Sequence, residues 1–228
     1  MNLAILDVET TGLDPAKDRV IEVAVCLYSV TYRAPIESYA SLVYSETNEA
    51  EAVNGIPVGL LASVSRHASV FGSVVDIADT LIRAADFVVA HNASFDRQWF
   101  DGEFDIEDRW SWLCTYRDFQ WPKSGPTNLA ALALAHGVPV LSAHRAMADV
   151  DTLVRLFQRV AELGHDVEDI VRKAARPKKR YVAMVSYADR DKAKRAGFEW
   201  EAEARRWVRD MPQEDVAALP FEAREVVR

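Results

Sequence analysis

The sequence predicts an α/β protein in which helices flank a mixed sheet, and three observations support this. Residues 2–8 form a short, almost wholly apolar run, which is typical of a strand buried on both faces. Residues 19–29 and 37–44 predict two further strands, so the chain begins with a three-stranded meander. Helix and strand patterns then alternate, which is typical of a layered α/β domain.

The later elements follow in chain order. A helix is expected at residues 73–85, because Val74, Ala78 and Leu81 recur at helical spacing. A strand is expected at 87–90, and a helix is expected to begin at Ser94. Two further helices are expected at 127–136 and 146–163, where Gly137 and Gly164 would end them.

The composition limits the class of protein. Of the 228 residues only Cys26 and Cys114 are cysteines, so a disulfide framework is excluded and both thiols are expected to be reduced and buried. No apolar run approaches the ~18–20 residues that cross a membrane. Residues 1–6 lack the basic start of a signal peptide, so we expect a cytoplasmic protein with no membrane partner.

The charge divides the chain into an acidic body and a basic tail. Residues 1–170 hold 12 Lys+Arg against 25 Asp+Glu, whereas residues 171–228 hold 15 against 10. This asymmetry suggests that the body binds cations and the tail binds an anion. A charged linker and helix that are simply exposed to solvent would give the same charge distribution.

We expect a main domain at 1–171, a basic linker at 172–180 and a small α+β module at 181–228. In the module a strand is expected at 181–187 and a helix at 189–196, with one or two strands at 198–208.

Asp7 and Glu9 lie two residues apart at the end of the first predicted strand. A strand has a period of two, so both side chains project from one face, together with Leu3 and Ile5. Two adjacent carboxylates on a buried strand repel each other unless a cation lies between them. The pair alone is also compatible with a strand end that reaches water.

Asp96 and Asp149 are the other acidic candidates. Asp96 falls in the first turn of a predicted helix, where interaction with the helix dipole would also explain it. From Asp149, helical steps reach Leu153, Leu156 and Val160, whereas from Asp151 they reach polar residues. Asp151 is therefore expected to form an exposed pair with Arg155, and Asp149 to point towards the core, where it needs a partner.

Carboxylates that converge at one sheet edge would bind Mg²⁺ or Mn²⁺. Two such ions ~3.5–4 Å apart are the usual arrangement for attack on a phosphodiester. His144, five residues before Asp149, would act as general base for the attacking water.

Three motifs together resemble the DEDDh family of 3′–5′ exonucleases, the DnaQ-like branch of the ribonuclease H-like fold. They are LDVETTG at 6–12, VAHNASFD at 89–96 and HRAMAD at 144–149. The second motif and WLCT at 112–115 are most similar to the exodeoxyribonuclease X and polymerase III epsilon-like group.

The resemblance implies the roles of individual residues. Asp7, Glu9 and Asp149 would bind metal directly, Asp96 directly or through water, and His144 would be the base. Further substrate contacts are expected at Thr10, Thr11, Gly12, Leu13, Ile56, His91 and Asn92, with Leu13 packing on a base. Where the family often has His-Gly-Ile, this chain has Asn54-Gly55-Ile56, a departure that leaves open the role of Asn54.

The tail resembles a small module appended to DNA-processing enzymes. Trp200 and Trp207 would either stack on bases or form the core of the module, and core is favoured for at least one of them. Possible nucleic-acid contacts in the tail are Lys178, Lys179, Arg180, Lys192, Lys194, Trp200 and Trp207.

The expected function is metal-dependent 3′–5′ hydrolysis of DNA, preferentially at single-stranded ends, with release of nucleoside 5′-monophosphates. Two alternatives remain open. One is an RNA-trimming enzyme with the same chemistry, since discrimination rests on the 2′-hydroxyl. The other is a catalytically silent nucleic-acid-binding protein.

Overall fold

The computed structural model describes residues 1–64, 68–103, 111–123, 128–140 and 144–226. The chain divides into two compact units, Met1–Ala174 and Ala175–Arg228. Among the described residues, no helix combines the length and apolarity that a membrane span requires.

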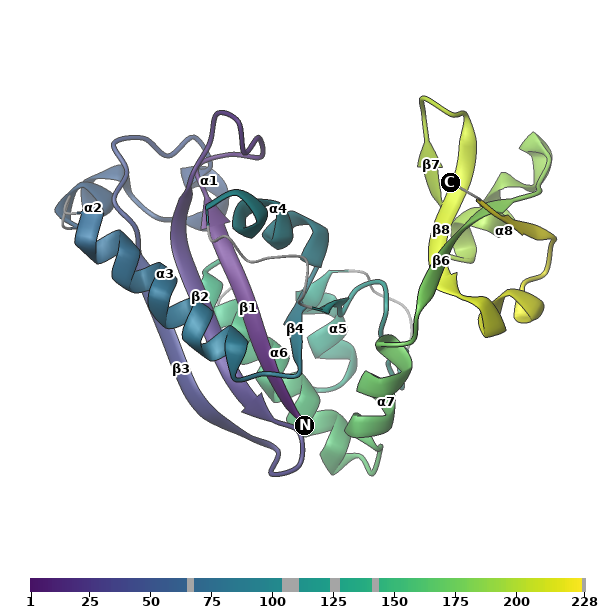
Figure 1. Ribbon diagram of the computed structural model, residues 1–228, viewed down its shortest axis with the longest axis horizontal. Coiled ribbons are helices and arrows are strands. Elements are labelled where there is room, and N and C mark those ends of the chain that lie inside the picture. The colour runs from purple at the N-terminus through teal and green to yellow at the C-terminus, as the bar shows by residue number, and fades with distance from the viewer. Residues whose placement is uncertain (65–67, 104–110, 124–127, 141–143, 227–228) are drawn as a thin grey trace. The chain divides into compact units, whose positions relative to one another are not determined.

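The first unit is built on a five-stranded mixed sheet in the order β3-β2-β1-β4-β5 (Figure 1). Strands β1 (Asn2–Thr10), β2 (Val20–Ser29) and β3 (Ala34–Leu42) form the predicted antiparallel meander. Strands β4 (Phe87–Ala90) and β5 (Trp112–Cys114) continue the sheet in parallel with β1. The predicted fold class, an α/β protein with a mixed sheet flanked by helices and a small C-terminal module, is confirmed.

Helices cover both faces of this sheet, which explains why every residue of β2 is buried. Helix α3 (Ala68–Arg83) packs on one face, where Ala4, Leu6 and Val8 join its core. Helix α6 (Ala146–Glu162) packs on the other face, where Phe157 stacks on Tyr28. The other helices of the unit are α1 (Glu51–Asn54), α2 (Val58–Ser63), α4 (Ala93–Glu103), α5 (Leu129–Ala135) and α7 (Val167–Ala174).

Some boundaries differ from the prediction. Helix α5 begins at Leu129, because the side chain of Asn128 caps it by accepting a hydrogen bond from Ala131 N at 2.8 Å. Residue 127 of the predicted helix lies outside the described residues. Strand β5 and helix α7 were not predicted, since β5 has only three residues and α7 only eight. Both cysteines are buried and free, as expected.

The second unit contains a four-stranded sheet in the order β7-β8-β6-β9. Its core contains Tyr181, Ala183, Ala193, Phe198 and Met211. Its elements are β6 (Lys178–Ala183), the 3₁₀ helix η1 (Tyr187–Asp189), α8 (Arg190–Arg195), β7 (Glu199–Glu201), β8 (Arg206–Pro212), the 3₁₀ helix η2 (Gln213–Ala218) and β9 (Ala223–Glu225).

Two predictions about this region need adjustment. The strand expected at 181–187 ends at Ala183, because the chain turns where Ser186 Oγ donates to Asp189 Oδ2 at 2.8 Å. The segment expected as a linker, 172–180, includes the end of α7 and the start of β6, which leaves residues 175–177 between these elements.

Candidate active site

Asp7 and Glu9 lie on β1 and project from the face of the sheet that α6 covers. Ala4, Leu6 and Val8 alternate with them and pack into the core on the α3 face. Both acids are half-buried. The period-two argument therefore places their side chains on one face, as predicted.

Asp149 lies in the first turn of α6 and meets the two acids of β1. A carboxylate oxygen from each of Asp7, Glu9 and Asp149 lies within 4.8 Å of the other two. Asp151 instead forms an exposed ion pair with Arg155, with Nε and Oδ2 2.7 Å apart. Helical spacing therefore predicted correctly that Asp149 lies on the inner side of the helix and Asp151 on its exposed side.

Asp96 comes from the first turn of α4 and is only 1% exposed. Its Oδ1 accepts a hydrogen bond from Val8 N at 3.2 Å. Because Val8 stands between Asp7 and Glu9, this bond attaches α4 to β1 beside the two acids. The turn that leads into α4 is tight, with Asn92 in the left-handed region at φ 69°.

Burial raises the pKa values of all four carboxyls, and repulsion from neighbouring acids adds to the effect. Burial, followed by repulsion from Asp96 and Asp149, raises the pKa of Asp7 well above its ordinary value. Burial, followed by repulsion from Asp149, raises the pKa of Glu9 to about 7. Burial also raises the pKa of Asp96 to about 8. Burial raises the pKa of Asp149 despite the lowering effect of a hydrogen bond from the His144 backbone.

This set of oxygen donors fits a hard divalent cation. Such a cation takes carboxylate oxygen and water as ligands, and its charge would offset the repulsion that raises these pKa values. Asp7, Glu9 and Asp149 supply the convergent oxygens.

His144 lies just before α6 and is exposed. Its backbone is left-handed, with φ 59°, which is uncommon for a residue other than glycine. The imidazole is therefore carried on a tight turn at the start of the helix that also carries Asp149.

Sequence reasoning missed Glu22, a buried carboxylate of β2. It stands opposite Glu9 in the β1–β2 register and is 4% exposed. Its Oε1 lies 2.8 Å from Arg145 Nη2. A single charge within the apolar run VIEVAVCLYS was the signal that could have identified it.

The end of β1 and the loop after it hold four of the predicted substrate residues, Thr10 to Leu13. Thr11 Oγ1 donates to Asp18 Oδ1 at 3.1 Å, and Asp14 N donates to Asp18 Oδ2 at 2.9 Å. The Asp18 carboxylate lies so close to Gly12 that a Cβ there would collide with it. Leu13 is 80% exposed, so its apolar side chain lies open to solvent.

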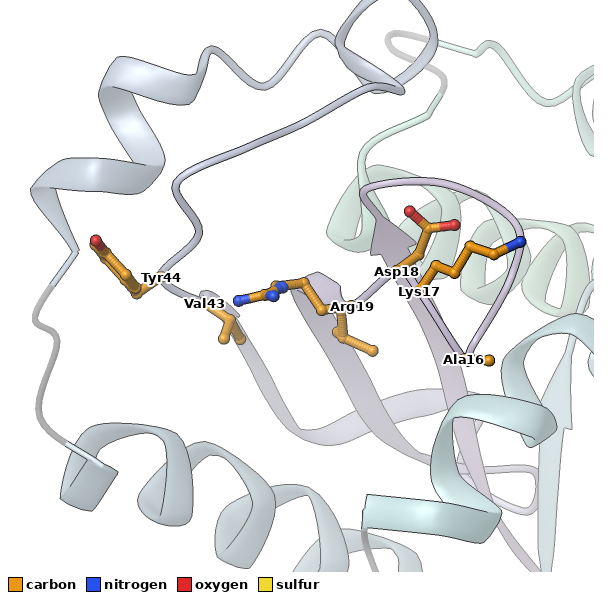
Figure 2. Close-up of a pocket in the computed structure, with 7 residues that line it drawn as sticks. Ala16, Lys17, Asp18, Arg19, Val43 and Tyr44 are labelled. Atoms are coloured by element: carbon orange, nitrogen blue, oxygen red, sulfur yellow. The ribbon is translucent and has the colours of Figure 1, made fainter.

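A shallow pocket of about 360 Å³ lies beside the same loop (Figure 2). Figure 2 shows the side chain of Arg19 extending towards Val43, while that of Lys17 points to the other side of the loop. None of the four acidic candidates is among its described lining residues, which are Ala16, Lys17, Asp18, Arg19, Val20, Val43 and Tyr44.

Asn54 and Ile56 occupy buried positions. Ile56 is fully buried against Ile21 and Leu61, so it lies in the core and not on an open binding surface. Asn54 Nδ2 donates to Thr10 O at 3.2 Å, and Asn54 Oδ1 accepts from Ile56 N at 3.0 Å. Asn54 therefore connects this segment to the end of β1.

His91 and Asn92 follow β4. The Nδ1 atom of His91 lies 2.9 Å from Thr115 Oγ1, and its ring centroid lies 6.1 Å from that of Tyr116. Asn92 is exposed. These two residues are thus carried by the turn that leads into α4.

In the second unit, the cations proposed as nucleic-acid contacts lie largely in ion pairs. Lys179 pairs with Glu225 at 2.9 Å, Arg180 with Glu201 at 2.8 Å and Lys192 with Asp189 at 2.8 Å. Lys194 is exposed on α8, and Lys178 is half-buried on β6.

The two tryptophans of the second unit differ in exposure. Trp207 packs against the core, whereas Trp200 is 51% exposed, and their ring centroids are 5.6 Å apart. Trp207 thus contributes to the packing of the module as a partly buried residue, and stacking of either tryptophan on bases stays a prediction.

A mixed sheet with helices on both faces thus carries a cluster of carboxylates where the end of β1 meets the start of α6. Residues 4–157 match the model of the Exonuclease family of RNase T type, and the chain belongs to that family. It is an exonuclease enzyme of the DnaQ-like branch. Residues 179–226 match a second model, described as a domain of unknown function (DUF8626).

Three known proteins show the extent of the similarity. The chain is 26% identical over 175 residues to the 3′–5′ exonuclease DinG of Staphylococcus epidermidis, covering 72% of this chain and 19% of DinG. It is 29% identical over 164 residues to the DNA polymerase III subunit epsilon of Treponema pallidum, covering 66% of this chain and 72% of the subunit. The structure of Exonuclease X in complex with 5′ overhanging duplex DNA matches with TM-score 0.55 and 22% identity, covering 75% of this chain and 99% of that one.

Proposed function

We propose that this protein hydrolyses DNA from the 3′ end, preferentially at single-stranded ends, and releases nucleoside 5′-monophosphates. The observation that carries the proposal is the convergence of Asp7, Glu9 and Asp149 within 4.8 Å, from a strand and a helix far apart in the chain. The DNA in the Exonuclease X complex supports DNA as the substrate.

Asp7, Glu9 and Asp149 would hold Mg²⁺ or Mn²⁺ in a two-ion site, with Asp96 binding directly or through water. When bound, such ions polarise the scissile phosphate and stabilise the attacking and leaving oxygens. The protein's own contribution is a rigid set of donors, because β1, α4 and α6 are all packed elements of one core.

His144 would accept the proton of the attacking water. Its exposure just before α6 leaves the imidazole open to water. Asp149 lies in the first turn of α6, five residues after His144, so the base and the metal ligand are both carried by the start of this helix.

The loop after β1 and the turn after β4 would hold the 3′-terminal nucleotide. Backbone groups of Thr10, Thr11 and Gly12 would bind it, and the exposed Leu13 would pack against its base. His91 and Asn92 would approach from the turn after β4. The second unit would add contacts through Trp200 and the surrounding cations.

The test compares matched DNA and RNA oligomers labelled at the 5′ end, in Mg²⁺, in Mn²⁺ and in EDTA. A ladder that shortens from the 3′ end, appears only with metal and forms faster on DNA would support the proposal. Faster shortening of RNA would indicate the RNA-trimming alternative. Binding of both oligomers without any product would indicate a silent binding protein.

A further inference from the structure

Glu22 is a carboxylate that the proposed metal site does not use. It lies near the start of β2, is 4% exposed and has apolar neighbours on both sides in the sequence. In the antiparallel register it faces Glu9, a proposed metal ligand. A buried carboxylate beside another one is costly unless it is paired and hydrogen-bonded.

Three hydrogen bonds satisfy Glu22, and all come from two consecutive residues. Arg145 Nη2 donates to Oε1 at 2.8 Å, and Arg145 Nε donates to Oε2 at 3.0 Å, which is the two-pronged geometry that arginine favours. Ala146 N donates to Oε2 at 3.0 Å. Both carboxylate oxygens are therefore engaged.

The bond from Ala146 makes Glu22 the cap of α6. Ala146 is the first residue of the helix, and the residue at the cap position, Arg145, makes no cap hydrogen bond with its own side chain. A carboxylate at this end satisfies a free N–H group and interacts favourably with the helix dipole. Residues 22 and 145 thereby link β2 directly to the start of α6.

The linked segment carries two members of the proposed site. His144 immediately precedes Arg145 and has a left-handed backbone, with φ 59°. Asp149 N donates to Arg145 O at 3.0 Å, so the first turn of the helix is built on Arg145. A shift of Arg145 would therefore displace the segment that carries both His144 and Asp149, and with it Asp149 relative to Asp7 and Glu9.

We propose that Glu22 and Arg145 form a positioning pair that fixes His144 and Asp149 against the acids of β1. Glu22 serves the site through Arg145 and the helix end, not as a metal ligand. The inference rests on the proposed nuclease function and adds two residues to its machinery.

The test uses Glu22→Gln and Arg145→Lys in the full chain. Glu22→Gln keeps the shape of the side chain but removes its charge. Arg145→Lys keeps a positive charge but loses the fork geometry, at a side chain that is 39% exposed and so tolerant of change. The matched control is Asp151→Asn, which removes the exposed ion pair with Arg155 on the same helix.

Two quantities are measured for each folded variant: kcat and KM on single-stranded DNA, and the affinity for Mn²⁺ alone by titration calorimetry. We expect both test variants to lose roughly 10–100-fold in kcat with little change in KM, and to bind Mn²⁺ about 10-fold more weakly. Asp151→Asn should match the wild type in both quantities.

The proposal is overturned if folded Arg145→Lys and Glu22→Gln keep wild-type kcat and Mn²⁺ affinity. It is also overturned if the losses of kcat and Mn²⁺ affinity are no larger than the loss of folded protein measured by circular dichroism. The pair would then have a purely structural role. If Glu22→Gln does not fold, the result for Arg145→Lys, a substitution at a partly exposed side chain, decides whether the proposal holds. A wild-type protein without nuclease activity would refute the proposed function, and Mn²⁺ affinity would still decide the role of the pair.

Discussion

Asp96 and Val8 are joined by a hydrogen bond of 3.2 Å from the backbone N–H of Val8 to Asp96 Oδ1. The bond places a buried carboxylate from α4 at the point of β1 where Asp7 and Glu9 project. Four acids from three elements thus share one region, and without a cation their repulsion opposes folding.

The raised pKa values predict how stability depends on pH in the absence of metal. The pKa of Glu9 is raised to about 7 and that of Asp96 to about 8, whereas the unfolded chain releases these protons near pH ~4. Between about pH 4 and these raised pKa values, the folded state binds more protons than the unfolded state. The free energy of unfolding therefore falls as the pH rises through this range. Thermal unfolding in EDTA should therefore give a lower Tm at about pH 8 than at about pH 5.

Two further experiments distinguish this effect from a general loss of stability at high pH. Excess Mg²⁺ or Mn²⁺ should raise Tm at about pH 8, because a ligand that binds only the folded state stabilises it. Asp96→Asn should raise metal-free stability there by roughly 1–2 kcal/mol while lowering activity, as expected when a functional buried charge is removed. A metal-free Tm that is flat or rises with pH would contradict the account.

His144→Ala should slow hydrolysis by about 10²–10⁴-fold, the usual contribution of a general base. The substitution removes no buried contact, but it places alanine at a left-handed φ of 59°, so Tm should fall only slightly. Steady-state rates on single-stranded DNA measure the effect. His165→Ala, at an exposed histidine beyond the end of α6, is the control and should retain the full rate. Equal rates for both variants would remove His144 from the mechanism.

Gly12→Ala should disturb the loop after β1, because the new Cβ collides with the Asp18 carboxylate that holds this loop. A displacement of about 1 Å can cost on the order of 10²-fold, so we expect kcat/KM to fall by about that factor. Gly59→Ala is the control, since a Cβ there meets nothing within 4 Å. Kinetics on single-stranded DNA should separate the two variants, and an active Gly12→Ala would show that the loop does not position substrate.

Truncation after Ala174 should weaken DNA binding and reduce its salt dependence. Residues 1–174 form a compact unit of their own, so the metal site should persist. For every phosphate that the second unit neutralises, its removal should lower the slope of log K against log salt by about 0.7 for a single strand. Fluorescence anisotropy at several salt concentrations measures this slope. An unchanged slope would mean that the second unit does not bind the nucleic acid.

Local periodicity was enough to predict β1, β2, β3 and β4 of the main sheet, the acidic strand end and the face of α6 that carries Asp149. These features depend on spacing along one element, which the sequence shows directly. The separation of Asp149 from Asp151 is the clearest case, because helical spacing alone distinguishes the buried side from the exposed one.

Features that depend on distant partners were not predictable in the same way. Glu22 pairs with Arg145 across 123 positions of sequence, and no local pattern indicates that contact. Ile56 follows the family motif, but its burial against Ile21 depends on how the segment after β3 folds back on the sheet. Asn54 likewise acquires its partners only when Asn48 and the end of β1 come together.

Asp7, Glu9 and Asp149 are proposed to form the metal centre of a nuclease. The most direct test is hydrolysis of 5′-labelled single-stranded DNA with Mg²⁺ by the wild type, Asp149→Ala and Asp151→Asn. The account predicts a ladder shortening from the 3′ end for the wild type and Asp151→Asn, and none beyond the EDTA background for folded Asp149→Ala. A full ladder from Asp149→Ala, or loss of the ladder from Asp151→Asn alone, would contradict it.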